Sequence, residues 1–398
     1  MKNFVKIVVL AVALTGVFYL LSAKNIVTPH SGGASVVNFV GKEVKNENLE
    51  ALPLTKIKEC LNRAGKTGDC LDKLFGEYLK NHTTKGALAV LQNYEDNDLN
   101  FRYSCHPVVH AVGHETFKIK KTIHDSFQAC DQTCHSGCYH GAMERFLRGG
   151  ASDDEDAHIS EDELKNKVAA ACDPNQPSRF RFQCLHGLGH ALVFFLNYKL
   201  EKSLGGCDLL GDQWSKSSCY GGAFMENVFA ADPTKRDLSK TDYHYPCNKL
   251  DKKYKYDCYI MQTTRMSEMG LTTDELFKEC KNAGSDFRQQ CIQSIGRDLS
   301  NEARVKPPEE TAKKCEMVAG EDRKSCIKGV IYALIDNTWD GKYAYPFCAS
   351  FSSFADSSFC FGQSGGYFKS IYSKTNQETK AECDKYLKYP WVCRFTAI

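Results

Sequence analysis

The chain has 398 residues, of which 42% are hydrophobic and 25% are charged. This is the composition of a folded globular protein, and it excludes wholesale disorder. Lysine and arginine total 51 against 49 aspartates and glutamates, so the net charge of +2 leaves no basic field and argues against nucleic acid as a partner.

An apolar run near the N-terminus predicts export. Two lysines precede this run, so residues 1–23 have the charged start and hydrophobic core of a signal peptide or of an uncleaved signal anchor. We expect one of the two, and an anchor would contact the membrane through residues 4–23. In both cases the bulk of the chain is extracytoplasmic (secreted, periplasmic or anchored facing outward), where disulfides persist. Residues 24–52 are polar and without periodicity, which predicts a linker.

The spacing of the twenty cysteines indicates a repeat. Sixteen form pairs whose members are 10 to 12 residues apart, and from Cys172 onward the first members recur every 33 to 40 residues. Such a period is typical of stacked helical hairpins, in which one cysteine on each helix near the shared turn lies within disulfide reach. The pairs are Cys60/Cys70, Cys172/Cys184, Cys207/Cys219, Cys247/Cys258, Cys280/Cys291, Cys315/Cys326, Cys348/Cys360 and Cys383/Cys393. We therefore predict an all-α fold over residues 53–398, a disulfide-stapled α-solenoid of about ten hairpins.

The other four cysteines leave two interpretations open. In the first, Cys130 pairs with Cys138 as a shortened hairpin, and Cys105 pairs with Cys134 to link two neighbouring units. In the second, Cys134, His135 and Cys138 bind a metal. An oxidising compartment favours the disulfides. The chain has no Cys-x-x-Cys, which argues against zinc ribbons, thioredoxin-like sites and c-type haem attachment.

Metal-ligand side chains recur at one position of three consecutive units, at about residues 86–198. Aligned on the second helix of each unit, the pairs are His110 and His114, His140 and Glu144, and His186 and His190. Each pair is spaced i,i+4, which places both side chains on one helix face and suits a transition metal. Since packed helices are about 8–10 Å apart, the six side chains can face one shared cavity. We expect a compact site there, centred on His140 and Glu144, with one or two iron, zinc or copper ions.

Three glutamates are candidate catalytic residues. Glu144, Glu226 and Glu115 lie on or beside these helices and would accept a proton where a metal activates water or dioxygen. Glu226 falls one position outside the repeat frame. We therefore expect it to contact a metal ligand without binding the metal itself, or to take part in proton transfer. A competing interpretation is packing, because Gly141 and Gly187 directly follow the first histidine in two units and would let helices approach closely.

The sequence leaves three functions open. An exported metalloenzyme, acting on a small-molecule or protein substrate, requires an open coordination position and a pocket. A metal-handling protein without catalysis predicts a saturated or solvent-facing site and no substrate pocket. A non-catalytic scaffold that binds a protein or glycan on its concave surface predicts histidines that do not converge.

Overall fold

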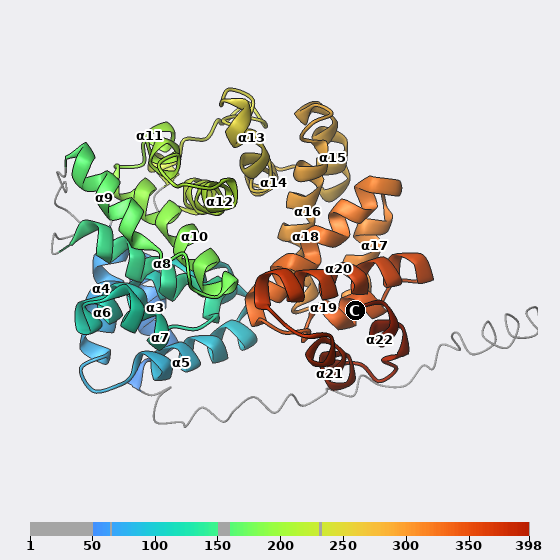
Figure 1. The fold of residues 1–398 in the computed structure, drawn as a ribbon, viewed down its shortest axis with the longest axis horizontal. Helices are drawn as coiled ribbons and strands as arrows, with labels where there is room; N and C mark the ends of the chain where they lie inside the picture. Colours follow the sequence, from blue (N-terminus) through green and yellow to red (C-terminus); the bar gives the residue numbers. More distant parts are fainter. Residues whose placement is uncertain (1–50, 64–65, 150–159, 231–232, 398) are drawn as a thin grey trace, which may run out of the picture. The chain divides into compact units, whose positions relative to one another are not determined.

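A computed structural model describes residues 51–63, 66–149, 160–230 and 233–397, and all regular structure in these residues is helical (Figure 1). The predicted all-α fold is thereby confirmed. The predicted signal segment at residues 1–23 lies outside the described residues, as do residues 24–50 of the predicted linker. Leu52, at the end of that linker, is fully buried, and its carbonyl oxygen accepts a hydrogen bond from the Tyr94 hydroxyl.

The helices follow one another with short connections. They are α3 (Leu54–Leu61), α4 (Thr67–Tyr78), α5 (Thr84–Asn97), α6 (Leu99–Lys120), α7 (Ile123–Ala129), α8 (Thr133–Arg148), α9 (Glu161–Ala171), α10 (Ser178–Phe195), α11 (Leu200–Cys207), α12 (Gln213–Phe229), η1 (Pro233–Lys235), α13 (Lys252–Tyr259), α14 (Gln262–Glu268), α15 (Thr273–Glu279), η2 (Cys280–Ala283), α16 (Arg288–Ala303), α17 (Pro308–Glu316), α18 (Gly320–Thr338), α19 (Ala344–Ala349), α20 (Phe354–Tyr372), α21 (Asn376–Tyr386) and α22 (Trp391–Thr396). Within the part of the chain that the structure describes, no helix has the length and apolarity to cross a membrane.

Ten disulfides tie neighbouring helices together, with Cα–Cα distances of 5.3–5.8 Å. All eight regular pairs form as predicted. The favoured pairing of the remaining four cysteines is also confirmed, because Cys130 bonds to Cys138 and Cys105 to Cys134. The interpretation of Cys134 and Cys138 as metal ligands is therefore wrong, since a disulfide sulfur is no thiolate. Ten disulfides indicate an oxidising, extracytoplasmic environment.

Local sequence signals explain several helix boundaries. Thr272 and Glu275 form a reciprocal capping box at the start of α15, and Pro308 occupies the first turn of α17, where its missing N–H costs nothing. One unit departs from the expected hairpin, because Cys247 lies in a series of turns rather than in a first helix. Pro246 directly precedes this cysteine, and a proline removes a helical donor and disfavours helix at the residue before it.

The second helix of each unit packs against the second helix of the next, in the succession α6, α8, α10, α12. Glycines make these contacts unusually close. A Cβ atom at Gly113 on α6 would lie 2.2 Å from the Cys138 carbonyl oxygen on α8, and one at Gly141 on α8 would lie 1.9 Å from the His110 carbonyl oxygen. Backbone therefore packs on backbone at this crossing, which no larger residue permits. Gly189 on α10 makes the same kind of contact with α12.

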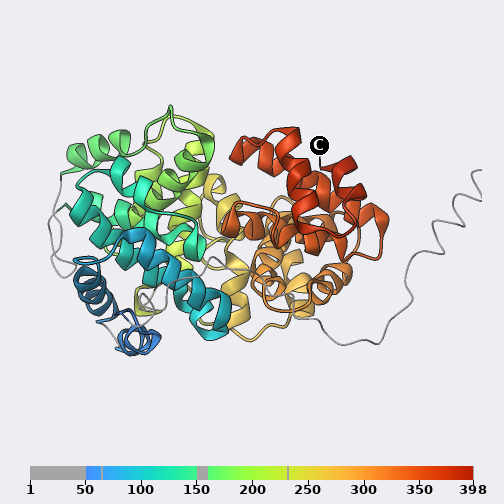
Figure 2. The same ribbon diagram turned by 90° about the horizontal axis from the view of Figure 1, so that it is seen from below.

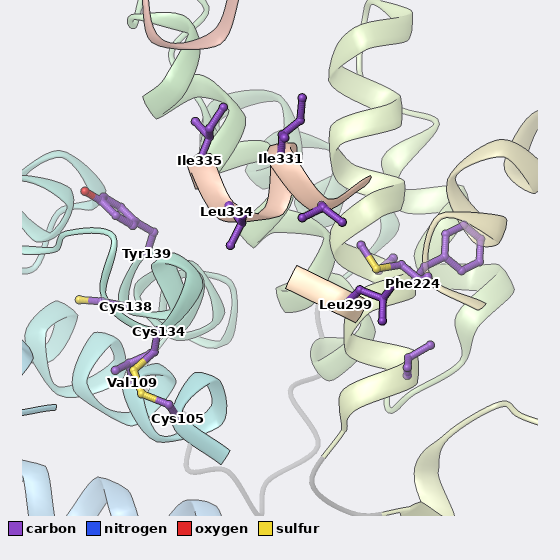
Figure 3. Packing of buried hydrophobic residues seen from close by; sticks show 14 of the residues in the cluster. Cys105, Val109, Cys134, Cys138, Tyr139, Phe224, Leu299, Ile331, Leu334 and Ile335 are labelled. Atoms are coloured by element: carbon purple, nitrogen blue, oxygen red, sulfur yellow. A yellow bond between two sulfur atoms is a disulfide. The ribbon is translucent and has the colours of Figure 1, made fainter. Parts of the chain in front are cut away.

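Helices far apart in the sequence also meet. Arg304 after α16 forms an ion pair of 2.8 Å with Glu95 on α5, where both side chains are about 1% exposed. The Asn337 side chain on α18 is hydrogen-bonded to His135 on α8, at 3.0 Å. Figure 2 shows the two groups of helices that these contacts join, α5–α10 and α16–α20, from below. Figure 3 shows the apolar side chains of α18, among them Leu334, beside the segment with the Cys105–Cys134 disulfide. These contacts bring α5–α10 and α16–α20 around a common interior.

Candidate metal centre

Four histidines converge from three consecutive helices. His106 and His110 on α6, His140 on α8 and His190 on α10 each offer one ring nitrogen, and these four nitrogens all lie within 4.8 Å of one another. We call this set the four-histidine group. The close glycine contacts described above bring the three helices near enough for the rings to meet. His140 and His190 are each about 1% exposed and His110 about 9%, so three of the four side chains are buried.

Hydrogen bonds on the far side of three rings fix which nitrogen faces the group. His106 Nδ1 donates to the Cys134 carbonyl oxygen at 2.8 Å. His110 Nδ1 donates to Glu144 Oε1 at 2.9 Å, and His190 Nδ1 pairs with Glu226 Oε2 at 2.8 Å. Metal-binding histidines are held in the same way, by a carbonyl or carboxylate behind the ring that leaves Nε2 free to bind.

Ring nitrogens of the four-histidine group approach one another closely. His106 Nε2 and His110 Nε2 are 3.1 Å apart, and neither carries a proton if both Nδ1 atoms donate. His140 Nδ1 lies 3.4 Å from His106 Nε2, while the Nε2 atoms of His140 and His190 have no hydrogen-bond partner among the described residues. Burial and the neighbouring histidines hold the pKa of His106, His140 and His190 well below 6.5. These rings are therefore neutral at neutral pH, and each has one unprotonated nitrogen that can act as a metal ligand.

His114, a predicted ligand, lies outside the four-histidine group. Its Nδ1 is 2.9 Å from Asp72 Oδ1 and its Nε2 is 2.7 Å from Glu144 Oε2, so both ring nitrogens are occupied. Burial lowers the pKa of His114, but the two carboxylates outweigh burial and raise that pKa to about 10. His114 is thus an imidazolium that holds Glu144 in place behind His110. Arg145 pairs with the other oxygen of Asp72 at 2.9 Å.

The remaining predicted residues are placed differently from one another. His186 lies beside the group, with its ring centroid 5.1 Å from those of His140 and His190. Glu226 joins the site through His190 and forms a second set with His110 and Glu144, whose donor atoms are all within 4.8 Å. Burial and the Glu144 charge raise the pKa of Glu226 to about 7.

Glu115 is not part of the site. It belongs to α6 but faces α4, where its carboxylate lies 3.1 Å from the position that a Cβ at Gly76 would occupy. It also forms a 2.5 Å ion pair with Lys118. Because residues 114 and 115 point in directions about 100° apart on a helix, only one of them can face α8.

His106 is the member of the four-histidine group that the repeat alignment missed. It precedes His110 by four residues, so His106, His110 and His114 form one i,i+4,i+8 series on α6. The signal was present in the sequence, one turn before the aligned frame. The group draws on His106 and His110 from this series, whereas the repeat alignment selected His110 and His114.

A cavity of about 690 Å³ adjoins the group, and His106, His140 and His186 contribute to its wall. It is lined further by residues of α12, α13, α14, α16, α18 and α20. Comparison with protein families, curated proteins and solved structures found no match to this chain.

Proposed function

We propose that the protein is an exported metalloprotein that binds a transition-metal ion through His106, His110, His140 and His190. The observation that carries this proposal is the 3.1 Å separation of the Nε2 atoms of His106 and His110, whose Nδ1 atoms both face hydrogen-bond acceptors. Two lone pairs repel at this distance unless a proton or a cation lies between them. Nitrogens on a tetrahedral ion with bonds of 2.0–2.1 Å are about 3.3 Å apart, close to the 3.1 and 3.4 Å separations here.

The donor set favours iron, zinc or copper. Neutral imidazole suits all three, and a hard ion such as Mg²⁺ or Ca²⁺ prefers oxygen ligands. We also retain the expectation of a second ion at His110, Glu144 and Glu226, which would have to replace the hydrogen bond between His110 Nδ1 and Glu144. The scaffold we propose for this site is an α-solenoid of about ten hairpins, since inner helices pack in sequence and eight of the ten disulfides close a helical hairpin.

We favour an enzyme over a metal-handling protein or a scaffold. The cavity reaches the ligand histidines His106 and His140, so a molecule held there would lie against the metal. Glu226, with its pKa near 7, would be able to exchange a proton through His190 at neutral pH. A bound metal would supply Lewis acidity for activating water, or redox chemistry for dioxygen. A carrier needs the four ligands but no adjoining cavity.

The first test is metal content. The protein, purified with its disulfides intact, should contain close to one equivalent of iron, zinc or copper by plasma mass spectrometry, or two if both sets are filled. His140→Ala should lose that metal, whereas the matched control His124→Ala, at an exposed position on α7, should retain it. Circular dichroism would establish that both variants fold. Wild-type protein that binds none of these metals, even after refeeding, would leave the protein- or glycan-binding scaffold as the better function.

A second measurement separates enzyme from carrier. Cobalt(II) loaded into the site should show visible d–d bands that shift when azide is added, because catalysis at a metal with four histidine ligands requires that it accept a fifth ligand or release one histidine. A spectrum that azide does not change would indicate a saturated site and would favour metal handling.

A further inference from the structure

The cavity carries an electrostatic signature of its own, separate from the four-histidine group. Arg236 pairs with Glu268 at 3.0 Å and Arg297 with Asp298 at 2.7 Å. Arg102 donates to the backbone carbonyl oxygen of Glu95, whose carboxylate is paired with Arg304. Two lining carboxylates, Asp257 on α13 and Asp336 on α18, have no ion-pair partner among the described residues. The lining thus has four carboxylates, those of Asp257, Glu268, Asp298 and Asp336, against three arginines, and it is net negative when all four carboxylates are ionised.

Asp336 is held by hydroxyl groups alone. Its carboxylate accepts hydrogen bonds from Tyr367 at 2.9 Å and from Tyr372 at 2.7 Å. Burial raises the pKa of Asp336 to about 6, and the two hydroxyls only partly oppose this. A buried carboxylate without a cation is costly, and its usual compensation in a folded protein is a charged partner. The Asp336 carboxylate lines the cavity, so a cation bound in the cavity would be such a partner.

Asp257 repeats the pattern on another wall. It is 8% exposed and accepts a hydrogen bond of 2.6 Å from Ser217 Oγ. Burial raises its pKa to about 7, with no cation acting on it. Two unrelated helices thus present the same arrangement, a carboxylate positioned by hydroxyl donors and facing the same cavity. One buried carboxylate without a cation destabilises a fold only moderately. Two of them in one cavity suggest that a bound cation compensates their charge.

Aromatic rings complete the lining. Tyr332 and Tyr367 stack at a centroid distance of 4.2 Å beside Asp336. Trp214, Phe229 and Tyr256 also line the cavity and remain 37–48% exposed, although they are large and apolar. Aromatic faces attract cations, and exposed rings around a carboxylate are how proteins recognise amines and quaternary ammonium groups.

We propose that this cavity binds a small organic cation, an amine or ammonium group on an apolar body, through Asp257, Asp336 and the aromatic rings beside them. The volume of about 690 Å³ is within the range of pockets for small molecules. The inference does not depend on the metal, because it uses none of the four histidines as ligands. If the metal is present, the bound molecule lies between the carboxylates and the histidine wall.

The test is calorimetric titration of the full-length protein at pH 8 with two cations, benzylamine and choline, and with two neutral molecules, benzyl alcohol and methyl glucoside. At least one cation should bind, and benzyl alcohol, which has the shape of benzylamine without its charge, should bind at least about tenfold more weakly. Asp336→Asn and Asp257→Asn should each weaken cation binding by a similar factor. Asp340→Asn should not, because Asp340 also accepts a tyrosine hydrogen bond, from Tyr386, but does not line the cavity.

Several results would overturn the inference. These are no binding of either cation, equal binding of benzylamine and benzyl alcohol, binding of methyl glucoside alone, or folded Asp336→Asn and Asp257→Asn variants with wild-type affinity. Metal content measured on the same samples keeps the two proposals apart. Cation binding without metal contradicts only the metal proposal, and metal content without cation binding contradicts only this one.

Discussion

Gly141 packs so closely on His110 that a Cβ atom at position 141 would lie 1.9 Å from the His110 carbonyl oxygen. The same relationship recurs one pair of helices further on, where a Cβ at Gly222 would lie 1.9 Å from the carbonyl oxygen of His186. In both cases a glycine is in contact with the backbone of a histidine of the repeat frame. The glycines and the histidines are therefore parts of one arrangement, because the glycine contact determines how near two histidine-bearing helices can come.

Gly141→Ala tests this arrangement. The added methyl group cannot fit at 1.9 Å, so α6 and α8 must separate, and we expect a loss of about 1–3 kcal/mol in the free energy of unfolding. Metal content should fall with it, since His110 and His140 would move apart. Gly205→Ala is the matched control: it has open space around its Cβ position on α11 and should be neutral or stabilising by up to about 1 kcal/mol. Urea denaturation measures both, and equal stability of the two variants would contradict the argument.

His114 provides the complementary case, a histidine that supports the site without belonging to it. It bridges the carboxylates of Asp72 and Glu144 with both ring nitrogens. His114→Ala should destabilise the fold by about 3–5 kcal/mol, because it removes the cation beside the buried Glu144 carboxylate and leaves Asp72 with Arg145 alone. The folded fraction should nevertheless keep its metal, in contrast to His140→Ala. A His114→Ala variant that is stable but free of metal would show that His114 is a ligand instead.

The cysteine and histidine patterns show how much of the structure could be predicted from the sequence. Nine of the disulfides were predictable because their cysteines are close in sequence, 8 to 12 residues apart, whereas Cys105–Cys134 followed only as the pair left over. The convergence of His110, His140 and His190 followed from the repeat. The repeat does not determine the rotation of each helix about its own axis. This rotation directs His106 into the four-histidine group and His114 toward Asp72. Contacts such as Arg304 with Glu95, 209 residues apart, depend on the summed geometry of many units, so the cavity and its two carboxylates had no sequence signal.

The Cys105–Cys134 disulfide should matter for metal affinity as well as for stability. Cys105 is adjacent to His106, and the Cys134 carbonyl oxygen accepts the hydrogen bond from His106 Nδ1. Residues 134–136 have left-handed backbone angles, with φ of 50–63°, a conformation that the crosslink helps to hold. A double Cys105→Ser, Cys134→Ser variant should therefore bind the metal about 10- to 100-fold more weakly.

The control is another disulfide of the same protein. Removing Cys383–Cys393, between α21 and α22, should cost about 2–4 kcal/mol of stability, as the Cys105–Cys134 variant does, but leave metal affinity unchanged. Competition with a chromogenic chelator measures the affinities. If both variants lose affinity equally, the loss comes from general destabilisation, and His106 needs no crosslink to be positioned.

Asp257→Asn should make the protein more stable at alkaline pH. The pKa of Asp257 is raised from 3.8 to about 7 in the folded state, so the folded protein holds its proton more tightly than the unfolded chain does. Stability from this group is fully present below pH 3.8 and is lost as pH rises through 7, where the carboxylate is charged and buried. Asparagine keeps the oxygen that accepts from Ser217 and carries no charge, so the variant should exceed the wild type by roughly 1–3 kcal/mol at pH 8. The difference should shrink steadily between pH 7 and pH 4.

Thermal unfolding across this range measures the difference in stability. The control is Asp286→Asn, which changes an exposed carboxylate paired with Lys252 and should show no such gain. A wild type that is the more stable protein at pH 8 would mean that Asp257 already has a cationic partner within the protein, and the case for a bound organic cation would lose one of its two carboxylates.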